Sequence, residues 1–395
     1  MRAGRYPVAL HVAVVSGSRA DFGPLQPLMA GLRDDDRFRL STIVCAVAGA
    51  DEADRQAGAF RAAGLPFDAF VTVREPGDGR PGPLPMPVQA ARSLEGVATE
   101  LETLRPDLVM LLGDRFEILA AAFAAHLVRI PIVHLSGGDE TLGSLDDAMR
   151  HAISRLAALH LPTNEQAARR LGALGVPADR IEVVGSTALD TLVTFSPMAR
   201  HDLAASIDAE LDGNVVAVTY HPATMADEPP VTTFRALLAG VRDAAPDATV
   251  VVTGSNADEG GAAIDAEARR AAASDARVVL VPSLGVDRYW SLLHHADAVV
   301  GNSSSALIEA PVLGVPVVDV GARQASRLRA DTCIHATAER GAIADGVAAA
   351  LARSRTPEPS PYGDGRAVPR ILDLLASIED PAGLLTPRPL IPVED

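Results

Sequence analysis

The fold class follows from one stretch of the sequence, Ala298-Val-Val-Gly-Asn-Ser-Ser-Ser-Ala-Leu-Ile-Glu-Ala-Pro311. A strand-like apolar run ends in Gly301 and Asn302, three serines follow, and an apolar-periodic helix carries Glu309. The start of such a helix presents free backbone N–H groups and the positive end of the helix dipole, which together form a seat for a phosphate. Glu309 in the next turn is placed to accept hydrogen bonds from sugar hydroxyls, so the stretch suggests a nucleotide site. Taken alone, however, a serine-capped helix after a buried strand explains it better.

The same strand-turn-helix pattern repeats along the whole chain. Strands are expected at residues 8–15, 40–47, 108–112, 130–134, 181–184, 215–219, 249–253, 278–281, 298–300 and 315–320. Helices are expected at 24–33, 51–63, 90–104, 115–127, 146–158, 164–174, 231–244, 262–273, 287–294, 304–313, 342–351 and 369–378. Continuous apolar strands that alternate with helices predict parallel sheets covered on both faces.

Each half of the chain holds enough strand-helix units for its own doubly wound domain. We therefore expect an α/β protein with two Rossmann-like domains that face a central cleft, the arrangement called GT-B. The expected domains are residues 1–190 and 191–380, with a mixed polar connection at 188–211 and a loose tail at 381–395. Ligands of such sheets bind at the carboxyl ends of the strands, so the polar residues there are the candidates for a site.

Composition excludes several classes of partner. The chain has 395 residues and a formal net charge of −16, which argues against nucleic acid and anionic membranes. It contains no apolar run of transmembrane length and no signal-peptide pattern. Cys45 and Cys333 lie in apolar runs and are expected to be buried free thiols, which suits a cytoplasmic protein. The cysteines and histidines show no metal-binding spacing.

In the first half, three strand exits carry polar residues. The first is a small glycine-containing turn with Arg19, and the second carries Asp114 and Arg115. The third is a glycine-rich loop with four acids, including Asp139 and Asp146. A helix-capping role explains an isolated aspartate such as Asp114 equally well, but four acids in one loop exceed what capping needs. Arg150 stands four residues after Asp146, so the two side chains can pair on one helix face.

In the second half, His221 follows the strand at 215–219 and precedes Pro222, which holds it in extended geometry. A histidine there can act as a general acid or base, or as a donor to phosphate, although alone it is more often structural. The strand at 315–320 runs into an arginine-rich loop that begins with Arg323. Such loops are usually only solvated, but in an acidic protein this one suggests an anion contact.

Taken together, these motifs resemble those of the hydrolysing UDP-N-acetylglucosamine 2-epimerases, a family that serves sialic and legionaminic acid synthesis. The matching segments run in order along the chain: Gly17-Ser-Arg-Ala-Asp-Phe-Gly23, Gly113-Asp-Arg-Phe-Glu117, Gly137-Gly-Asp139, Asp146, Arg150-His-Ala-Ile-Ser154, Thr219-Tyr-His-Pro222, Asn256-Ala-Asp258, Ser283-Leu-Gly285, Tyr289, Gly301-Asn-Ser-Ser304, Glu309-Ala-Pro311 and Gly321-Ala-Arg-Gln324. The family fold has two Rossmann-like domains with the site between them, as expected above from the residues alone.

The resemblance implies the chemistry. UDP is eliminated across C1–C2 of the sugar to give a glycal, and water then adds to release the free 2-epimer. Donors to the diphosphate stabilise the leaving group, and carboxylates stabilise the cationic ring and move protons. The resemblance implies no redox cofactor, no metal and a homodimer.

Roles follow residue by residue from the resemblance. Asp114, Asp139, Asp146 and His221 are expected to be catalytic, with Arg150 restraining Asp146. The expected diphosphate ligands are Ser303, Ser304, His221, Arg19 and Arg323, and Arg115 also contacts substrate. Glu309 is expected to hold the ribose, and Tyr289 lies just after the turn expected to line the uracil.

Two positions bear on the branch and on the substrate. Ser136 stands where many members carry Glu or His, and a serine is not a comparable base, so Asp139 takes that role or the sugar lies differently. After His221 the chain reads Pro222-Ala-Thr rather than the Arg-Arg-Glu-Asn of the non-hydrolysing epimerases, which favours the hydrolysing branch.

The favoured reading is UDP-N-acetylglucosamine conversion to N-acetylmannosamine and UDP. The alternatives are the same chemistry on a UDP-2,4-diacetamido-2,4,6-trideoxy sugar, a GT-B glycosyltransferase, and a non-catalytic UDP-sugar-binding protein. The acid-rich loop favours glycal chemistry over transfer.

Overall fold

The computed structural model describes residues 9–17, 19–46, 50–73, 84–141, 144–222, 229–255 and 260–386; the side chains of residues 19, 20, 46 and 50–53 lie outside the description. The chain divides into two compact units. Unit 1 comprises Met1–Asp139, Asp146–Thr191 and Gly365–Asp395, and unit 2 comprises Glu140–Leu145 and Leu192–Asp364. The chain therefore enters unit 2 briefly at Glu140 and returns to unit 1 at Asp146.

Unit 1 is built on a six-stranded sheet with the order β3-β2-β1-β4-β5-β6, and its neighbouring strands are all parallel. Its elements are β1 (Leu10–Ser16), α1 (Arg19–Asp34), β2 (Phe38–Ala46), α2 (Ala50–Ala62), β3 (Ala69–Thr72), α3 (Met86–Leu104), β4 (Leu108–Leu112), α4 (Phe116–Leu127), β5 (Ile132–Leu135), α5 (Asp146–Leu156), β6 (Leu159–Leu161), α6 (Glu165–Ala173), η1 (Ala178–Arg180), α14 (Ala367–Ala376) and η2 (Ala382–Leu385). This strand order is that of a Rossmann fold.

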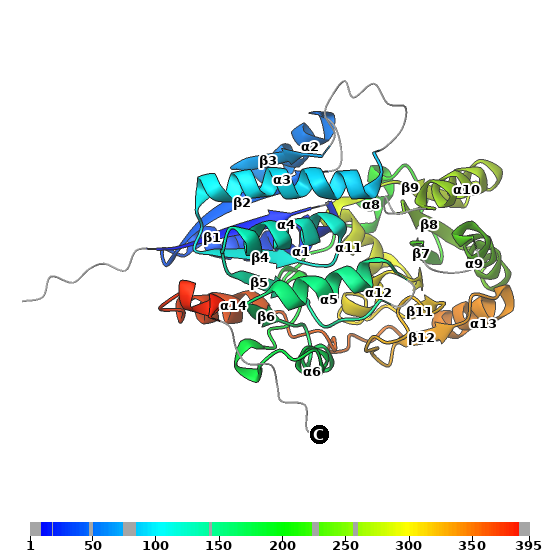
Figure 1. The fold of residues 1–395 in the computed structure, drawn as a ribbon. Helices are drawn as coiled ribbons and strands as arrows, with labels where there is room; N and C mark the ends of the chain where they lie inside the picture. The colour runs from blue at the N-terminus through cyan, green and yellow to red at the C-terminus, as the bar shows by residue number, and fades with distance from the viewer. Residues whose placement is uncertain are drawn as a thin grey trace, which may run out of the picture. The chain divides into compact units, whose positions relative to one another are not determined.

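Both faces of this sheet are buried because successive side chains of a strand point to opposite sides. Val12 and Val14 of β1 pack in the core that contains the apolar residues of α1 and α14. Ala13 and Val15 pack in a second core with α3 and α4, which lie side by side (Figure 1). The near-continuous apolar strands of the sequence are thus explained by burial on two faces.

Unit 2 repeats the same plan. Its elements are α8 (Arg200–Ser206), β7 (Val215–Thr219), α9 (Pro230–Ala244), β8 (Thr249–Thr253), α10 (Gly261–Ser274), β9 (Val278–Val281), α11 (Gly285–His295), β10 (Ala298–Gly301), α12 (Ser304–Ile308), β11 (Val317–Val320), β12 (Cys333–Ala336) and α13 (Arg340–Leu351). Its parallel sheet has the order β12-β11-β10-β7-β8-β9, which is again the Rossmann order counted from β7. The short α7 (Ala188–Leu192) spans the boundary between the units.

Both faces of the unit 2 sheet are buried: Ala217 and Val299 lie on one face, and a core cluster lies on the other. Val216 and Val218 of β7 pack there against the apolar faces of α9 and α13. The prediction of two Rossmann-like domains is therefore confirmed, and each has the alternation of strand and helix that the sequence indicates.

Two local expectations were wrong. Residues 181–184 form no named strand; Ile181 makes only an isolated bridge to His160, and β6 takes the edge position of the sheet. The helix expected at 304–313 ends at Ile308 because Pro311 has no N–H to continue it and disfavours helical geometry in the residue before it. The connection at 188–211 contains the helices α7 and α8.

The last helix returns to unit 1. We expected residues 191–380 to form one domain, but Val368, Ile371 and Leu375 of α14 are part of the unit 1 core beside α1. The backbone N–H groups of Ala367 and Val368 donate to the carboxylate of Asp190, at 2.9 and 2.7 Å. The start of α14 is thereby fixed to the end of the second segment of unit 1, Asp146–Thr191.

The strand orders place one topological switch point in each unit, where ligands of doubly wound folds bind. In unit 1 it lies between β1 and β4, and in unit 2 between β7 and β10. Among the helices that the structure describes, none is long and apolar enough to cross a membrane.

Candidate active site

At the unit 1 switch point, Asp114 follows β4 and its neighbour Gly113. The N-cap position of α4 is occupied by Arg115, so Asp114 does not have the simple capping role that the sequence left open. Its carboxylate instead accepts a hydrogen bond from Nη2 of Arg150 on α5, in an ion pair. The Asp114 side chain is 20% exposed and that of Arg150 is 5% exposed, so the carboxylate is the reachable half of the pair.

Arg150 organises the acidic loop as well. Its Nη1 donates to the backbone carbonyl of Asp139 at 2.9 Å and lies 3.7 Å from Oδ1 of Asp147. Asp139 itself is buried, and Asp146 is the first residue of α5 and partly buried. Arg150 therefore connects Asp114 to the backbone beside Asp139. The expected pairing of Arg150 with Asp146 stays a prediction.

A second buried group, His134, was not predicted from the sequence. One ring nitrogen, Nε2, lies 2.9 Å from the carbonyl of Gly113, and Nδ1 lies 3.1 Å from the hydroxyl of Ser154. Since a carbonyl only accepts, Nε2 carries the proton and Nδ1 accepts from the Ser154 hydroxyl. Burial lowers the pKa of His134 to about 4, so the ring is neutral. His134 thus ties the residue before Asp114 to the helix that carries Arg150.

Arg115 is held by the carboxylate of Glu117, which belongs to the Gly113–Glu117 motif but had no expected role. Nε of Arg115 donates to Oε1 of Glu117 at 2.8 Å, and Glu117 is fully buried. The other oxygen, Oε2, has no partner within the described part of the chain. A Cβ added at Gly17 would lie 2.5 Å from Cγ of Glu117, so the turn after β1 must carry glycine here. Arg19 begins α1, but its side chain lies outside the described residues, as do Asn256 and Asp258.

At the unit 2 switch point, Asn302 clamps the backbone of His221. The side chain of Asn302 accepts from the His221 N–H and donates to the His221 carbonyl, both at 2.8 Å. The two hydrogen bonds fix the backbone just after β7, and this backbone carries the imidazole of His221. Asn302 is 2% exposed. It lies in the Gly301–Ser304 motif, but the sequence alone indicated no role for it.

The imidazole of His221 is neutral in the free protein. Burial, helped by the charge of Arg323, lowers its pKa to about 3. A charged His221 could assist departure of UDP, but in the free protein the lowered pKa keeps the ring neutral. A neutral ring still donates one N–H, and a bound diphosphate would raise its pKa.

The serines form a chain of hydroxyls. Ser303 occupies the N-cap position of α12 without a side-chain capping bond, and its hydroxyl lies 3.0 Å from that of Ser305. The hydroxyl of Tyr289 lies 2.6 Å from the same Ser305 oxygen. Burial raises the pKa of Tyr289 to about 12, so it stays a neutral donor. Ser304 begins α12, and its side chain is partly exposed.

Glu309 follows directly after α12. Its Oε2 accepts from the indole Nε1 of Trp290 at 3.0 Å, and burial raises its pKa to about 7. The indole fixes one oxygen of this carboxylate, and a pKa near neutral pH lets the group ionise. The carboxylate can therefore accept hydrogen bonds from further hydroxyls.

The raised pKa gives a prediction for Glu309→Gln. Because the folded pKa is above the ordinary 4.5, the stability contributed by Glu309 is complete below about pH 4.5 and is lost as pH rises through 7. Glutamine keeps an acceptor for Trp290 but does not ionise. We expect the difference in melting temperature, variant minus wild type, to increase by about 2–4 °C between pH 5 and pH 8. Because Glu309 is partly exposed, we take the cost of ionising it in the folded protein as roughly 1 kcal/mol. Parallel melting curves across this range would contradict the assignment.

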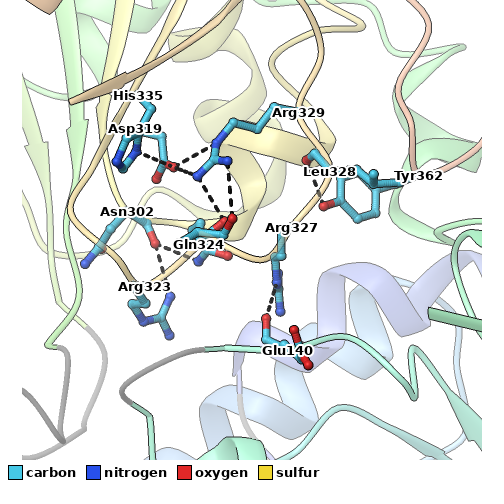
Figure 2. Close-up of polar contacts among 11 residues, drawn as sticks. Glu140, Asn302, Asp319, Arg323, Gln324, Arg327, Leu328, Arg329, His335 and Tyr362 are labelled. Atoms are coloured by element: carbon cyan, nitrogen blue, oxygen red, sulfur yellow. Dashed lines mark hydrogen bonds and ion pairs between the residues drawn. The ribbon is translucent and has the colours of Figure 1, made fainter. Parts of the chain in front are cut away.

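The loop at residues 321–329 surrounds the same strand exit (Figure 2). Arg323 Nη1 and Gln324 Nε2 donate to the carbonyl of Asn302 at 3.1 and 2.8 Å. The residue that clamps His221 is therefore itself held by this loop. Among the residues that the structure describes, no group of three or more His, Cys, Asp or Glu side chains is arranged to hold a metal ion.

The predicted site residues thus form two groups. In unit 1, hydrogen bonds from Arg150 link Asp114 to the backbone of Asp139, and Asp146 lies on the same helix as Arg150. The unit 2 group joins His221 to Arg323 through Asn302, and Ser303 to Tyr289 through Ser305; Glu309 follows α12. Acids and an arginine suit proton transfer, whereas hydroxyls, imidazole and guanidinium suit a diphosphate.

Comparison with known proteins agrees with this chemistry. Residues 84–376 match the model of the UDP-N-acetylglucosamine 2-epimerase family. A Campylobacter jejuni protein named GDP/UDP-N,N'-diacetylbacillosamine 2-epimerase (hydrolyzing) is 36% identical over 59% of this chain and 61% of its own length. A Legionella pneumophila protein named UDP-N,N'-diacetylbacillosamine 2-epimerase (hydrolyzing) is 29% identical over 93% of this chain and 96% of its own.

Solved structures agree on the fold. The UDP-GlcNAc 2-epimerase of Neisseria meningitidis, bound to UDP-GlcNAc, superposes with a TM-score of 0.77 at 19% identity, over 93% of this chain and 99% of that one. At this identity the likeness speaks for the two-domain, GT-B-like fold alone. The two relatives are named as hydrolysing enzymes, and the family match shows that the chain belongs to the UDP-N-acetylglucosamine 2-epimerase family.

Proposed function

We propose that the protein is a hydrolysing 2-epimerase whose substrate is a UDP-2,4-diacetamido-2,4,6-trideoxy sugar of the diacetylbacillosamine type. From the sequence alone, UDP-N-acetylglucosamine was the favoured substrate. Both relatives described above are named for the diacetamido sugar, so the second reading has the better support. The observation that carries the reaction class is the Asp114–Arg150 pair, whose arginine also holds the backbone of Asp139.

The proposed reaction breaks the bond between C1 and the UDP oxygen and removes the proton from C2, which leaves a C1=C2 glycal. Water then adds: hydroxide goes to C1, and a proton goes to C2 from the opposite face. The products are UDP and the free 2-epimer. The C2 proton is weakly acidic, so departure of UDP must run ahead and build positive charge on the ring.

In this proposal the unit 2 group stabilises the leaving diphosphate. Its donors are Ser303, Ser304, His221 and Arg323, and Arg19 of unit 1 is a further proposed donor; they act where negative charge develops as the C1–O bond breaks. His221 is neutral before the substrate binds, and the negative charge of the bound diphosphate raises the pKa of its imidazole. In addition, Glu309 accepts from the ribose hydroxyls, and Tyr289 lies beside the base.

The unit 1 acids handle the sugar. Asp114, Asp139 and Asp146 form the acid and base set, and Arg115 contributes a further substrate contact. Ser136, partly exposed at the exit of β5 with φ of 59°, is too weak a base to replace a carboxylate, so we assign proton removal at C2 to this aspartate set. For turnover the two groups must act on one sugar nucleotide.

Proton NMR in heavy water tests the proposal directly. The protein is incubated separately with the UDP-diacetamido sugar and with UDP-N-acetylglucosamine, without an acceptor. We expect UDP release, a free 2-epimer and deuterium at its C2, with kcat/KM at least about 10-fold higher for the diacetamido sugar. A higher kcat/KM for UDP-N-acetylglucosamine would reverse the substrate assignment. Turnover that requires an added acceptor would establish a glycosyltransferase, and UDP binding without turnover would establish a binding protein.

We also propose that the protein is a homodimer through α4. Phe123 and Leu127 lie four residues apart on this helix, so they share one face, and they are 44% and 60% exposed. A second copy of the chain would bury such a face by two-fold symmetry.

Light scattering after size exclusion tests the dimer. We expect wild type at twice the chain mass of 41.0 kDa and Leu127→Glu at the single mass, because a carboxylate cannot be buried in an apolar contact. Leu385→Glu, which changes another exposed leucine, should stay dimeric. A Leu127→Glu variant that keeps the dimer mass would place the interface elsewhere.

A further inference from the structure

The loop at residues 321–329, which we call the arginine loop, is fixed at both ends (Figure 2). Gln324 donates to the Asn302 carbonyl, and its own carbonyl accepts from Nη2 of Arg329 at 3.1 Å. The carboxylate of Asp319 on β11 accepts from Nε and Nη2 of Arg329 at 3.1 and 2.7 Å. At the other end, the hydroxyl of Tyr362 donates to the carbonyl of Leu328 at 3.0 Å. The backbone between these points therefore has one defined course.

From this fixed loop, Arg327 extends to a distant part of the sequence. Its Nε donates to the carbonyl of Glu140 at 3.1 Å, and its Nη2 donates to the hydroxyl of Thr141 at 3.1 Å. Figure 2 shows the guanidinium of Arg327 pointing toward Glu140. Thr141 is 3% exposed, so the contact is not a solvated surface pair. A planar guanidinium that grips two successive residues fixes the backbone direction as well as its position.

The segment that Arg327 grips lies between two candidate acids. Glu140–Leu145 belongs to unit 2, and Asp139 and Asp146 on either side of it belong to unit 1. The carbonyl of Asp139 accepts from Arg150, and the next carbonyl, that of Glu140, accepts from Arg327. Two arginines thus hold adjacent peptide groups of the same loop, and each comes from the unit to which its peptide belongs.

We infer that Arg327 is a positioning residue for Asp139, Glu140 and Thr141, which form the described start of the acid loop (residues 139–146), in the proposed epimerase reaction. It acts through the backbone of Glu140 and the hydroxyl of Thr141, and these set the course of the chain next to Asp139. Arg323 lies on the same arginine loop, so a diphosphate that binds Arg323 stabilises the loop and with it the grip of Arg327. Nucleotide binding in unit 2 and the conformation of the acid loop are thereby connected.

The first test is hydrogen exchange of the full chain, with Arg327→Met compared with wild type. Methionine keeps much of the apolar stem but removes both donors. We expect faster amide exchange in peptides that cover residues 139–146, and protection of these peptides by UDP in wild type but not in the variant. Arg340→Met is the matched control, since Arg340 pairs with Asp243 at the surface of the same unit. Unchanged exchange in Arg327→Met would overturn the inference whether or not the protein is an epimerase.

The second test is kinetic and uses the substrate that wild type turns over. Misplacing an acid by a fraction of an ångström to one ångström predicts a 10- to 100-fold lower kcat for Arg327→Met, with the UDP dissociation constant changed less than about 3-fold. Arg327→Lys keeps the charge but not the two-pronged grip, so it should remain impaired. Full kcat in either variant, or a loss of UDP affinity as large as the loss of kcat, would overturn the role. Absence of wild-type turnover would sink the proposed function instead, and the exchange result would still stand.

Discussion

Asp114→Asn is expected to lower kcat by about 10²- to 10⁴-fold, the range for loss of a general acid or base. The substitution removes the charge and the proton-transfer capacity at the unit 1 switch point. Asparagine still offers an oxygen to Arg150, so the chain should fold with a stability loss of about 1–3 kcal/mol. Asp114 is not among the proposed ligands of the diphosphate, so UDP affinity should change by less than about 3-fold.

A matched control lies at the other end of the same strand. The carboxylate of Asp107, just before β4, accepts from the backbone N–H of His11 at 2.8 Å, and Asp107→Asn retains that acceptor. We expect this variant to keep full kcat. Single-turnover kinetics with isothermal titration of UDP would separate the two effects. If Asp114→Asn kept more than a tenth of wild-type kcat, Asp114 would not be the proton-transfer residue.

Gly301→Ala is expected to have the largest effect on stability. Gly301 pairs with Thr219 across β10 and β7, with φ of 151°. A Cβ at this position would lie 1.9 Å from the Thr219 carbonyl oxygen, a distance that no real contact allows. The strands must separate, and that also breaks the clamp of Asn302 on His221. We expect a loss of at least about 3 kcal/mol, seen as a fall in melting temperature of roughly 6–12 °C.

Gly321→Ala separates crowding from backbone strain. Gly321 also has a positive φ, 80°, but an added Cβ would meet no heavy atom within 4 Å. Only the conformational cost remains, about 1–2 kcal/mol. UDP affinity should fall at least 10-fold in Gly301→Ala and stay near wild type in Gly321→Ala. Equal destabilisation of the two variants would show that the approach of β10 to β7 is not limiting.

Much of the fold could be predicted because buried parallel strands leave an unbroken apolar signature. β4, β7, β8 and β9 have the bounds expected from the sequence. The short strands β3, β6 and β12 were missed because three or four residues at a sheet edge carry little apolar pattern. The place of α14 could not be predicted, since an amphipathic helix does not say which core it will join.

The candidate site was predictable to the extent that it lies at strand exits. That rule singled out Asp114 and His221 as candidates, and the family resemblance then gave them their expected roles. His134 and Asn302 were not, because one lies inside an apolar strand and the other had no apparent partner in the sequence. Their importance comes from the backbone groups that they satisfy, Gly113 and the peptide of His221, and such pairings exist only in three dimensions.

The return of α14 to unit 1 has a consequence for biosynthesis. The apolar stripe of α1 is translated early, whereas the helix that covers it is translated almost last. At about 5–20 residues per second, translation of the interval from Thr191 to Gly365 takes on the order of 10–35 s. During that time the face of α1 around Gly31, which packs against Val368 and Leu372 of α14, lacks its cover, so we expect a chaperone that binds apolar segments to protect it.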